Sequence, residues 1–213
     1  DGDRTWRVAG GQATLYMLDK QAPLTVILNE QTGSNFTRYI HGPTGILAQQ
    51  NPNGDMRWML QDGLQSVRGV SDGTSVLSAQ AYSPYGEPMF TDLPTEFGFT
   101  GEQTDSANDL VYLRARYMNP RLGIFGSLDP LEGENMVVGS LNRYNWVRGN
   151  VVNRVDPSGL CEELPNIQFN ITTLITQHLS KNVSVASSTT TCNADEAIKT
   201  LKILLCHGMK NQL

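Results

Sequence analysis

The first 160 residues contain no cysteine and only one histidine, His41. This part of the chain therefore lacks the residues for a Cys–His nucleophile or for a metal-ligand cluster. No run in the sequence approaches eighteen apolar residues, so no transmembrane helix is predicted. Basic residues are outnumbered, with 16 Lys and Arg against 21 Asp and Glu. The resulting net charge of −5 argues against nucleic-acid binding through bulk positive charge.

The sequence also lacks an initiator methionine and a signal peptide, since it opens on Asp1-Gly2-Asp3. We therefore expect it to be a fragment of a longer protein. Its 213 residues suffice for one large or two small domains with a buried core. A hydrophobic content of 39% with 17% charged residues excludes a highly charged disordered chain.

The composition changes sharply after Leu160. Residues 1–160 hold 11 Arg and one Lys, whereas residues 161–213 hold four Lys and no Arg. The first part has 19 of the 20 Gly, 9 of the 10 Pro and 15 of the 16 aromatic residues, while all three cysteines lie in the second. Glycine, proline and aromatic residues together are typical of short strands joined by tight turns. We therefore predict a module boundary at Leu160.

Strand-like runs alternate with turn signals through the first part of the chain. The runs are Thr14–Leu18, Leu24–Leu28, Phe36–Ile40, Met56–Leu60 and Leu77–Tyr82. The segments between them, at 31–34, 51–54, 71–74 and 83–86, contain Gly, Asn or Pro, which favour turns. Residues 110–117 alternate with period two, which predicts one half-buried strand. The sequence thus predicts a string of antiparallel hairpins.

Several motifs in this part of the chain resemble those of the Rhs/YD-repeat family. Residues 39–49, 60–68 and 82–87 resemble one tyrosine–aspartate repeat unit, and residues 99–160 resemble the Rhs repeat-associated core domain. The second resemblance is carried by Phe99-Thr100-Gly101-Glu102, Leu113-Arg114-Ala115-Arg116-Tyr117, Pro120, Leu122-Gly123, Phe125, Asp129-Pro130, Leu141-Asn142-Arg143-Tyr144, Asn150, Asn153 and Asp156-Pro157-Ser158-Gly159-Leu160. These motifs in this order are specific for the family, although no single motif is.

The resemblance implies a mainly β fold, in which antiparallel YD-repeat hairpins form part of a β-shell and the core domain plugs it. We accordingly expect YD-repeat hairpins over residues 1–90, the core domain over 91–160 and a variable, helical C-terminal segment over 161–213. In this family that segment is usually a toxin of the polymorphic type, released by autoproteolysis. The resemblance also implies a secreted or cell-surface protein without a cofactor. Its implied partners are the rest of the shell, the C-terminal cargo, and an immunity protein or delivery machinery.

The resemblance places catalysis on Asp129 and Asp156, each of which precedes a proline. Two carboxyl groups that share one proton can activate a water and protonate a leaving amide, because like charges at close range cannot both ionise. The scissile bond is then Leu160–Cys161, cut once by the chain's own aspartic site. Around the pair we expect turn and core-motif roles for Pro130, Pro157, Gly159, Arg114, Arg116, Tyr117, Asn142, Arg143 and Tyr144.

The same residues allow a second interpretation. Asp156-Pro157-Ser158-Gly159 is a good type I turn by itself, so its aspartate need only shape a turn. The family commonly has an arginine directly before the first aspartate, where this chain has Leu128. A charge-assisted hydrogen bond to that carboxyl must then come from elsewhere, with Arg116, Arg121 and Arg143 as the candidates. Without cleavage, the chain is a structural or cell-surface interaction segment.

The sequence of the C-terminal segment, residues 161–213, predicts little beyond two helices. Asn193 is a good N-cap for a helix that ends near Gly208, and residues 171–179 suggest another. Cys192 and Cys206 flank the first of these helices, roughly 20 Å apart at its rise per residue, so any disulfide must use Cys161. We expect no metal site here. A third hypothesis makes this segment an effector enzyme, although it shows no recognisable site.

Overall fold

The computed structural model describes residues 3–43, 45–90, 93–133 and 138–165. These residues form antiparallel β-structure with short 3-10 turns, which confirms the mainly β prediction. The helices and the cysteine pairing predicted for the C-terminal segment lie outside the described residues. Within the described part of the chain, no helix has the length and apolar character needed to cross a membrane.

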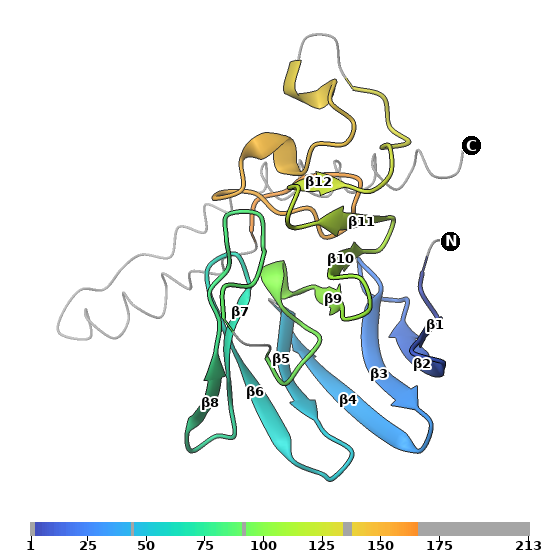
Figure 1. The fold of residues 1–213 in the computed structure, drawn as a ribbon, viewed down its shortest axis with the longest axis vertical. Coiled ribbons are helices and arrows are strands. Elements are labelled where there is room, and N and C mark those ends of the chain that lie inside the picture. The colour runs from blue at the N-terminus through green and yellow to red at the C-terminus, as the bar shows by residue number, and fades with distance from the viewer. Residues whose placement is uncertain (1–2, 44, 91–92, 134–137, 166–213) are drawn as a thin grey trace, which may run out of the picture. The chain divides into compact units, whose positions relative to one another are not determined.

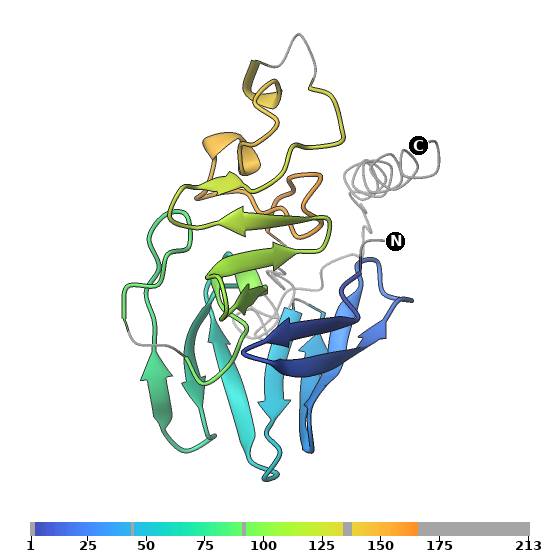
Figure 2. The same ribbon diagram turned by 45° about the vertical axis from the view of Figure 1, so that its right-hand side comes forward.

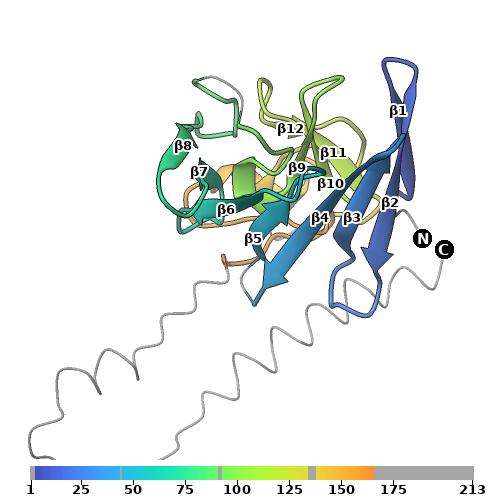
Figure 3. The same ribbon diagram turned by 90° about the horizontal axis from the view of Figure 1, so that it is seen from below.

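The larger sheet has eight strands in sequence order, each antiparallel to the next (Figure 1). They are β1 (Trp6–Ala9), β2 (Gln12–Asp19), β3 (Val26–Thr32), β4 (Asn35–Gly42), β5 (Gly45–Gln50), β6 (Met56–Gln61), β7 (Val67–Ser71) and β8 (Val76–Ala79). The five predicted runs fall within or overlap β2, β3, β4, β6 and β8. Seen from below, β1 to β8 follow one another along a curved sheet (Figure 3).

Short turns join these strands at the predicted separators 31–34, 51–54 and 71–74, whereas the turn at 83–86 follows β8. Between β3 and β4, Gly33 and Ser34 close a two-residue hairpin, and Gly33 has a φ of +60°, which glycine adopts without a Cβ penalty. Between β7 and β8, the carboxylate of Asp72 accepts the backbone N–H groups of Thr74 and Ser75, each at 2.8 Å. Local turn chemistry therefore sets the register of these hairpins.

Side chains of the larger sheet alternate between a buried and an exposed face. The buried face packs a hydrophobic cluster of Tyr16, Ile27, Tyr39, Ile46, Met59, Val67, Val70 and Phe97. Phe97 follows β8 in the chain, so the segment after the sheet folds back onto this face. The other face carries exposed side chains that include Leu15, Ile40 and Trp58. This alternation is the period-two pattern of a sheet covered on one side.

A second, four-stranded sheet has the order β12-β11-β10-β9 (Figure 2). Its strands are β9 (Gln103–Asp105), β10 (Leu110–Leu113), β11 (Arg116–Asn119) and β12 (Ile124–Phe125). The 3-10 turns are η1 (Phe99–Gly101), η2 (Val138–Ser140) and η3 (Val147–Gly149). A second hydrophobic cluster joins η1, β10, β11, β12 and η3, and it contains Phe99, Val111, Leu113, Met118, Phe125, Trp146, Val147 and Val151.

The prediction of a single strand over residues 110–117 is wrong, because the chain reverses at Arg114 and Ala115. Leu113 pairs with Arg116 across the resulting β10–β11 hairpin. Arg114 takes the left-handed conformation, with a φ of +56°, that such a tight turn requires. The two-residue turn shifts the alternation by one position. Arg116 therefore lies on the buried face together with Leu113, whereas an uninterrupted strand would place these two residues on opposite faces.

Hydrogen bonds and ion pairs fix Arg4 and Arg7 to β9 and to Glu96, which precedes it in the chain. Arg4 donates from Nη2 to Oε1 of Gln103 at 2.6 Å. Arg7 donates from Nη1 to Oδ1 of Asp105 at 3.0 Å and from Nη2 to Oε1 of Glu96 at 2.5 Å. These contacts join segments about a hundred residues apart in sequence, so β1 and the second sheet belong to one folding unit.

Candidate active site

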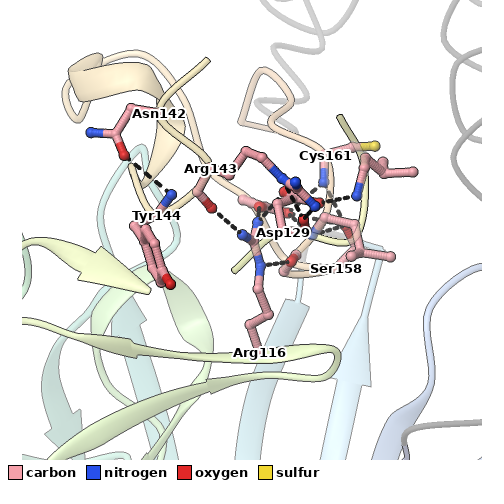
Figure 4. Close-up of polar contacts among 11 residues, drawn as sticks. Arg116, Asp129, Asn142, Arg143, Tyr144, Ser158 and Cys161 are labelled. Carbon is pink, nitrogen blue, oxygen red and sulfur yellow. Dashed lines mark hydrogen bonds and ion pairs between the residues drawn. The ribbon is translucent and has the colours of Figure 1, made fainter. Parts of the chain in front are cut away.

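Both aspartates predicted to be catalytic lie beside the guanidinium of Arg116. Figure 4 shows Asp129 and Arg116 with their neighbours. Nη2 of Arg116 lies 2.6 Å from Oδ2 of Asp129 and 3.7 Å from Oδ2 of Asp156. The exposed fractions of these side chains are 4% for Arg116, 14% for Asp129 and 4% for Asp156. Asp129 comes from the loop after β12, and Asp156 from a loop near the end of the described chain. The fold thus brings together two carboxyl groups that are 27 positions apart in sequence.

Arg116 is held in place by contacts on every nitrogen of its guanidinium group. Its Nε donates to the carbonyl oxygen of Gly159, and its Nη1 donates to that of Arg143 at 3.0 Å. The guanidinium carbon lies 3.5 Å from the ring centroid of Phe125. Such stacking suits a guanidinium better than an ammonium group. Arg116 therefore sits between the acidic pair, defined here as Asp129 and Asp156, with its orientation fixed.

Asp156 accepts three hydrogen bonds from its own turn. Its Oδ1 accepts the hydroxyl of Ser158 at 3.0 Å and the backbone N–H groups of Leu160 and Cys161, each at 3.1 Å. An antiparallel bridge between Val155 and Glu163 closes the loop that contains these residues. The nitrogen of the predicted scissile bond, that of Cys161, therefore lies within hydrogen-bonding distance of the Asp156 carboxyl.

Burial raises the pKa of the Asp156 carboxyl above its ordinary value. The hydroxyl of Ser158 and the positive charge of Arg116 act in the opposite direction, as do the two backbone N–H groups, but burial has the larger effect. Asp156 therefore keeps its proton to a higher pH than an exposed aspartate does. A protonated carboxyl beside an amide nitrogen can serve as a general acid when the C–N bond breaks.

Asp129 is positioned through its backbone as well as its side chain. Its Oδ1 accepts the backbone N–H of Leu131 at 2.9 Å. Its carbonyl oxygen accepts Nε of Arg143 at 2.8 Å, and its own N–H donates to the carbonyl oxygen of Arg143 at 3.1 Å. Its side chain meets Arg116, so the two aspartates differ in surroundings. Asp129 contacts a cation closely, while Asp156 contacts mainly neutral donors.

The Arg114-Ala115-Arg116 segment binds three consecutive carbonyl groups of the Asp156 loop. Nη1 of Arg114 donates to the carbonyl oxygen of Pro157, and the backbone N–H of Ala115 donates to that of Ser158 at 3.2 Å. Nε of Arg116 donates to the next carbonyl oxygen, that of Gly159. The β10–β11 hairpin therefore holds the loop with the predicted cleavage site in register, residue against residue.

Arg114 also fixes this hairpin to the larger sheet. Its Nη1 lies 2.9 Å from Oε1 of Glu102, and its Nε donates to the carbonyl oxygen of Thr25 at 2.9 Å. Burial raises the pKa of Glu102, while the charge of Arg114 opposes that shift. Arg114 thus connects the loop before β3, the end of η1 and the Asp156 loop.

The remaining motif residues lie around the site rather than in it. Oδ1 of Asn142 accepts the backbone N–H of Tyr144 at 3.2 Å, and Figure 4 shows both side chains directed away from Asp129. The hydroxyl of Tyr117 accepts a bond from Arg4 at 3.3 Å. Pro130 and Pro157 each follow one of the aspartates in its loop.

Of the three arginines considered for the missing position before Asp129, two are close to the acidic pair. Arg116 contacts the carboxylates, and Arg143 contacts the backbone of Asp129. Arg121 is 67% exposed and pairs instead with Asp109 at 3.3 Å. Leu128 has an apolar side chain that is 46% exposed, so it contributes no polar group to the site. The fold therefore supplies the positive charge from β11.

Sequence reasoning missed Ser158 and Glu102 as members of this site. Ser158 was visible only as a turn residue two positions after Asp156, a pattern in which serine often bonds its neighbours. Glu102 belonged to the quoted motifs, but only the fold places it against Arg114. Among the residues that the structure describes, no group of three or more His, Cys, Asp or Glu side chains is arranged to hold a metal ion.

Similar proteins were found by sequence and by structure, although no family model matches the chain. The tRNA3(Ser)-specific nuclease WapA of Bacillus spizizenii is 30% identical over 165 residues, and the tRNA nuclease WapA of Bacillus subtilis is 31% identical over 165. Each match covers 74% of this chain and 7% of the relative. Salivary gland surface protein 1 of Aedes aegypti is 30% identical over 128 residues, covering 58% of this chain and 4% of that protein.

The fold resembles a part of much larger solved structures. A crystal structure of TcdB2-TccC3 superimposes with a TM-score of 0.54 at 21% identity. The match covers 73% of this chain and 8% of that one. A crystal structure of TcdB2-TccC3 without its hypervariable C-terminal region matches with the same TM-score at 20% identity. The chain therefore spans less than a tenth of the length of each of these relatives and structures.

Proposed function

The chain is an Rhs/YD-repeat protein, and from this premise we propose that residues 1–160 are the end of a β-shell whose core domain cuts the chain after Leu160. Cleavage uses an aspartic mechanism and releases the segment that begins at Cys161. The observation that carries the proposal is the 3.1 Å separation between Oδ1 of Asp156 and the backbone nitrogen of Cys161. A buried acid therefore lies at the leaving group of the proposed reaction.

The two aspartates take different roles because their surroundings differ. Asp129, paired with Arg116 at 2.6 Å, acts as the carboxylate that removes a proton from the attacking water. The water oxygen adds to the carbonyl carbon of Leu160. Asp156 supplies a proton to the nitrogen of Cys161 as the C–N bond breaks. The products are the carboxyl group of Leu160 and the amino group of Cys161.

Placement of catalyst and substrate in one loop supports this mechanism. Asp156 lies only five positions before Cys161, and the loop is closed by the Val155–Glu163 bridge. Because the catalytic groups and the scissile bond belong to one chain, no separate substrate-binding step is needed. The effective concentration of a well-oriented catalytic group reaches about 10⁵ M. A modest general acid is then sufficient for a reaction that each chain performs once.

The family relationship extends the proposal to the whole protein. We infer that the released segment is a cargo of the toxin type, because the curated relatives in Bacillus are nucleases. The parent protein is then secreted or displayed at the cell surface. Its partners are the remainder of the shell, the cargo, and an immunity protein or delivery machinery.

A second candidate is a surface segment that folds in this way but does not cut. The similarity to a protein named salivary gland surface protein 1 favours it. So does the absence of an arginine at position 128, directly before Asp129. In this alternative, Asp129, Arg116 and Asp156 form a structural network that holds the last loop to the β10–β11 hairpin.

Intact mass of the expressed full chain distinguishes the two candidates. Autoproteolysis yields two products that correspond to a cut between Leu160 and Cys161, and neither Asp129→Asn nor Asp156→Asn is cut. Asp109→Asn is the matched control, because Asp109 pairs with the exposed Arg121 and should leave cleavage unchanged. An uncut wild-type chain at neutral pH would favour the surface segment. A cut at Asp156–Pro157 would indicate acid lability of that bond instead.

A further inference from the structure

The hydroxyl of Ser158 lies among the atoms that exchange protons in the proposed cleavage. Its Oγ donates to Oδ1 of Asp156 at 3.0 Å and accepts the backbone N–H of Cys161 at 3.1 Å. It also accepts the N–H of Leu160 at 3.1 Å. One hydroxyl therefore contacts both the acid and the nitrogen of the bond that the acid must protonate.

We propose that Ser158 is a catalytic residue that relays the proton from Asp156 to the leaving nitrogen of Cys161. The inference rests on the proposed autoproteolysis and adds a residue to it. In the relay, the Ser158 hydroxyl gives its proton to the nitrogen while it takes a proton from the Asp156 carboxyl. The Leu160–Cys161 C–N bond breaks and an N–H bond forms. Asp156 ends as a carboxylate, and the Ser158 hydroxyl is regenerated.

The geometry explains why a relay serves this site. Oδ1 of Asp156 accepts three hydrogen bonds, from Ser158, Leu160 and Cys161, so the relay passes the Asp156 proton through Oδ1 only when the Ser158 bond reverses and the hydroxyl becomes the acceptor. A hydroxyl both donates and accepts, and it rotates to suit its partners. Ser158 can therefore reverse the direction of its hydrogen bonds as the nitrogen of Cys161 changes from a donor to a proton acceptor.

The position of Ser158 is fixed independently of its hydroxyl. Its carbonyl oxygen accepts the backbone N–H of Ala115, and the neighbouring carbonyl groups of Pro157 and Gly159 bind Arg114 and Arg116. Removing the hydroxyl therefore leaves the backbone of the loop anchored at three consecutive residues. Ser158→Ala thus tests the hydroxyl rather than the shape of the loop.

The experiment measures the cleavage rate of the full chain. Chains made in a reconstituted translation system are collected in guanidinium chloride before cleavage is complete and diluted into buffers with increasing D₂O content. Ser158→Ala should cut at least about tenfold more slowly, because general acid catalysis contributes about 10² or more. Ser158→Thr, which keeps the hydroxyl, should restore most of the rate. Ser83→Ala is the matched control, since the Ser83 hydroxyl also accepts a turn N–H, that of Glu87, outside the site.

The dependence on D₂O separates proton transfer from loop positioning. In a relay two protons move in one step, so a plot of the wild-type cleavage rate against the D₂O fraction should be curved. Without the Ser158 hydroxyl only one proton moves, so the same plot for Ser158→Ala should be a straight line. A slower Ser158→Ala chain that keeps the wild-type curve would overturn the relay, because the hydroxyl would then only position the loop. Ser158→Ala cutting at the wild-type rate would also overturn it and leave autoproteolysis intact. An uncut wild-type chain would overturn both proposals.

Discussion

Gly159 packs directly against the carbonyl oxygen of Leu113, and a Cβ atom at this glycine would overlap with that oxygen. Gly159 also has a φ of +71°, which L side chains rarely adopt. Both requirements fall on the residue just before Leu160. The contact therefore sets how closely the loop with the proposed cleavage site approaches the β10–β11 hairpin.

Gly159→Ala should destabilise the protein and abolish cleavage. The positive φ alone costs about 1–2 kcal/mol for a residue with a Cβ, and the overlap with Leu113 adds to it. Urea unfolding measures the stability loss, and intact mass measures cleavage. Gly54→Ala is the control, because Gly54 has a φ of +90° but open space around its Cβ position. An equal stability loss in both variants would contradict the importance of the Leu113 contact.

Arg116→Lys should slow cleavage strongly although it keeps the positive charge. An ammonium group cannot reach Asp129, Asp156 and the carbonyl oxygen of Gly159 at the same time, whereas the guanidinium fork contacts all three. We expect a rate at least about a hundredfold lower, as for the loss of an oriented charge at a reacting centre. Arg121→Lys, on an exposed arginine, should cut at the wild-type rate. Normal cleavage by Arg116→Lys would show that charge alone suffices.

Arg114→Met should cost about 3–5 kcal/mol of unfolding free energy, because it leaves the buried carboxylate of Glu102 without its partner. Adding Glu102→Gln should recover part of that loss, since the uncompensated charge is then removed. Chemical denaturation of the two single variants and the double variant measures the coupling. Additive losses in the double variant would contradict a direct interaction. Cleavage should be slow in every variant that lacks Arg114, because Pro157 loses its anchor.

Glu30 should make stability depend on pH. Burial, followed by the like charge of Glu96, raises the pKa of Glu30 to about 6. A carboxyl whose pKa is higher in the folded state favours folding when protonated, and this contribution is lost as pH rises through about 6. Glu30→Gln should therefore stabilise the protein by about 1–2 kcal/mol near pH 8 and have little effect near pH 4.

Urea unfolding of Glu30→Gln at the two pH values tests this expectation. Glu87→Gln is the control, because the side chain of Glu87 is half exposed and pairs loosely with Arg121 at 3.6 Å. A stability change for Glu30→Gln that is equal at both pH values would show that the altered hydrogen bond between residue 30 and Tyr39, rather than ionisation, is responsible.

The sequence predicted the hairpins better than it predicted how the residues around Asp129 and Asp156 contact one another. Turn residues such as Gly33 act locally, so the connections of the larger sheet follow from the sequence. The reversal at Arg114 was missed, because polar and apolar residues continue to alternate along the sequence through a two-residue turn. The residues after the turn nevertheless lie on the opposite face from the one that a continuous strand would give them. The charge beside Asp129 comes from Arg116, thirteen positions earlier, and only tertiary packing selects it over Arg121. Long-range pairings of this kind leave no periodic signal.

Because the proton donor and the bond that it faces lie within five residues of each other, they leave the ribosome almost together, after all the strands that must hold them. Under the proposed function, the chain cannot cut until nearly all of residues 1–160 have been made and folded. The order of synthesis then ensures that the segment after Leu160 is released only once the β-structure that precedes it has folded.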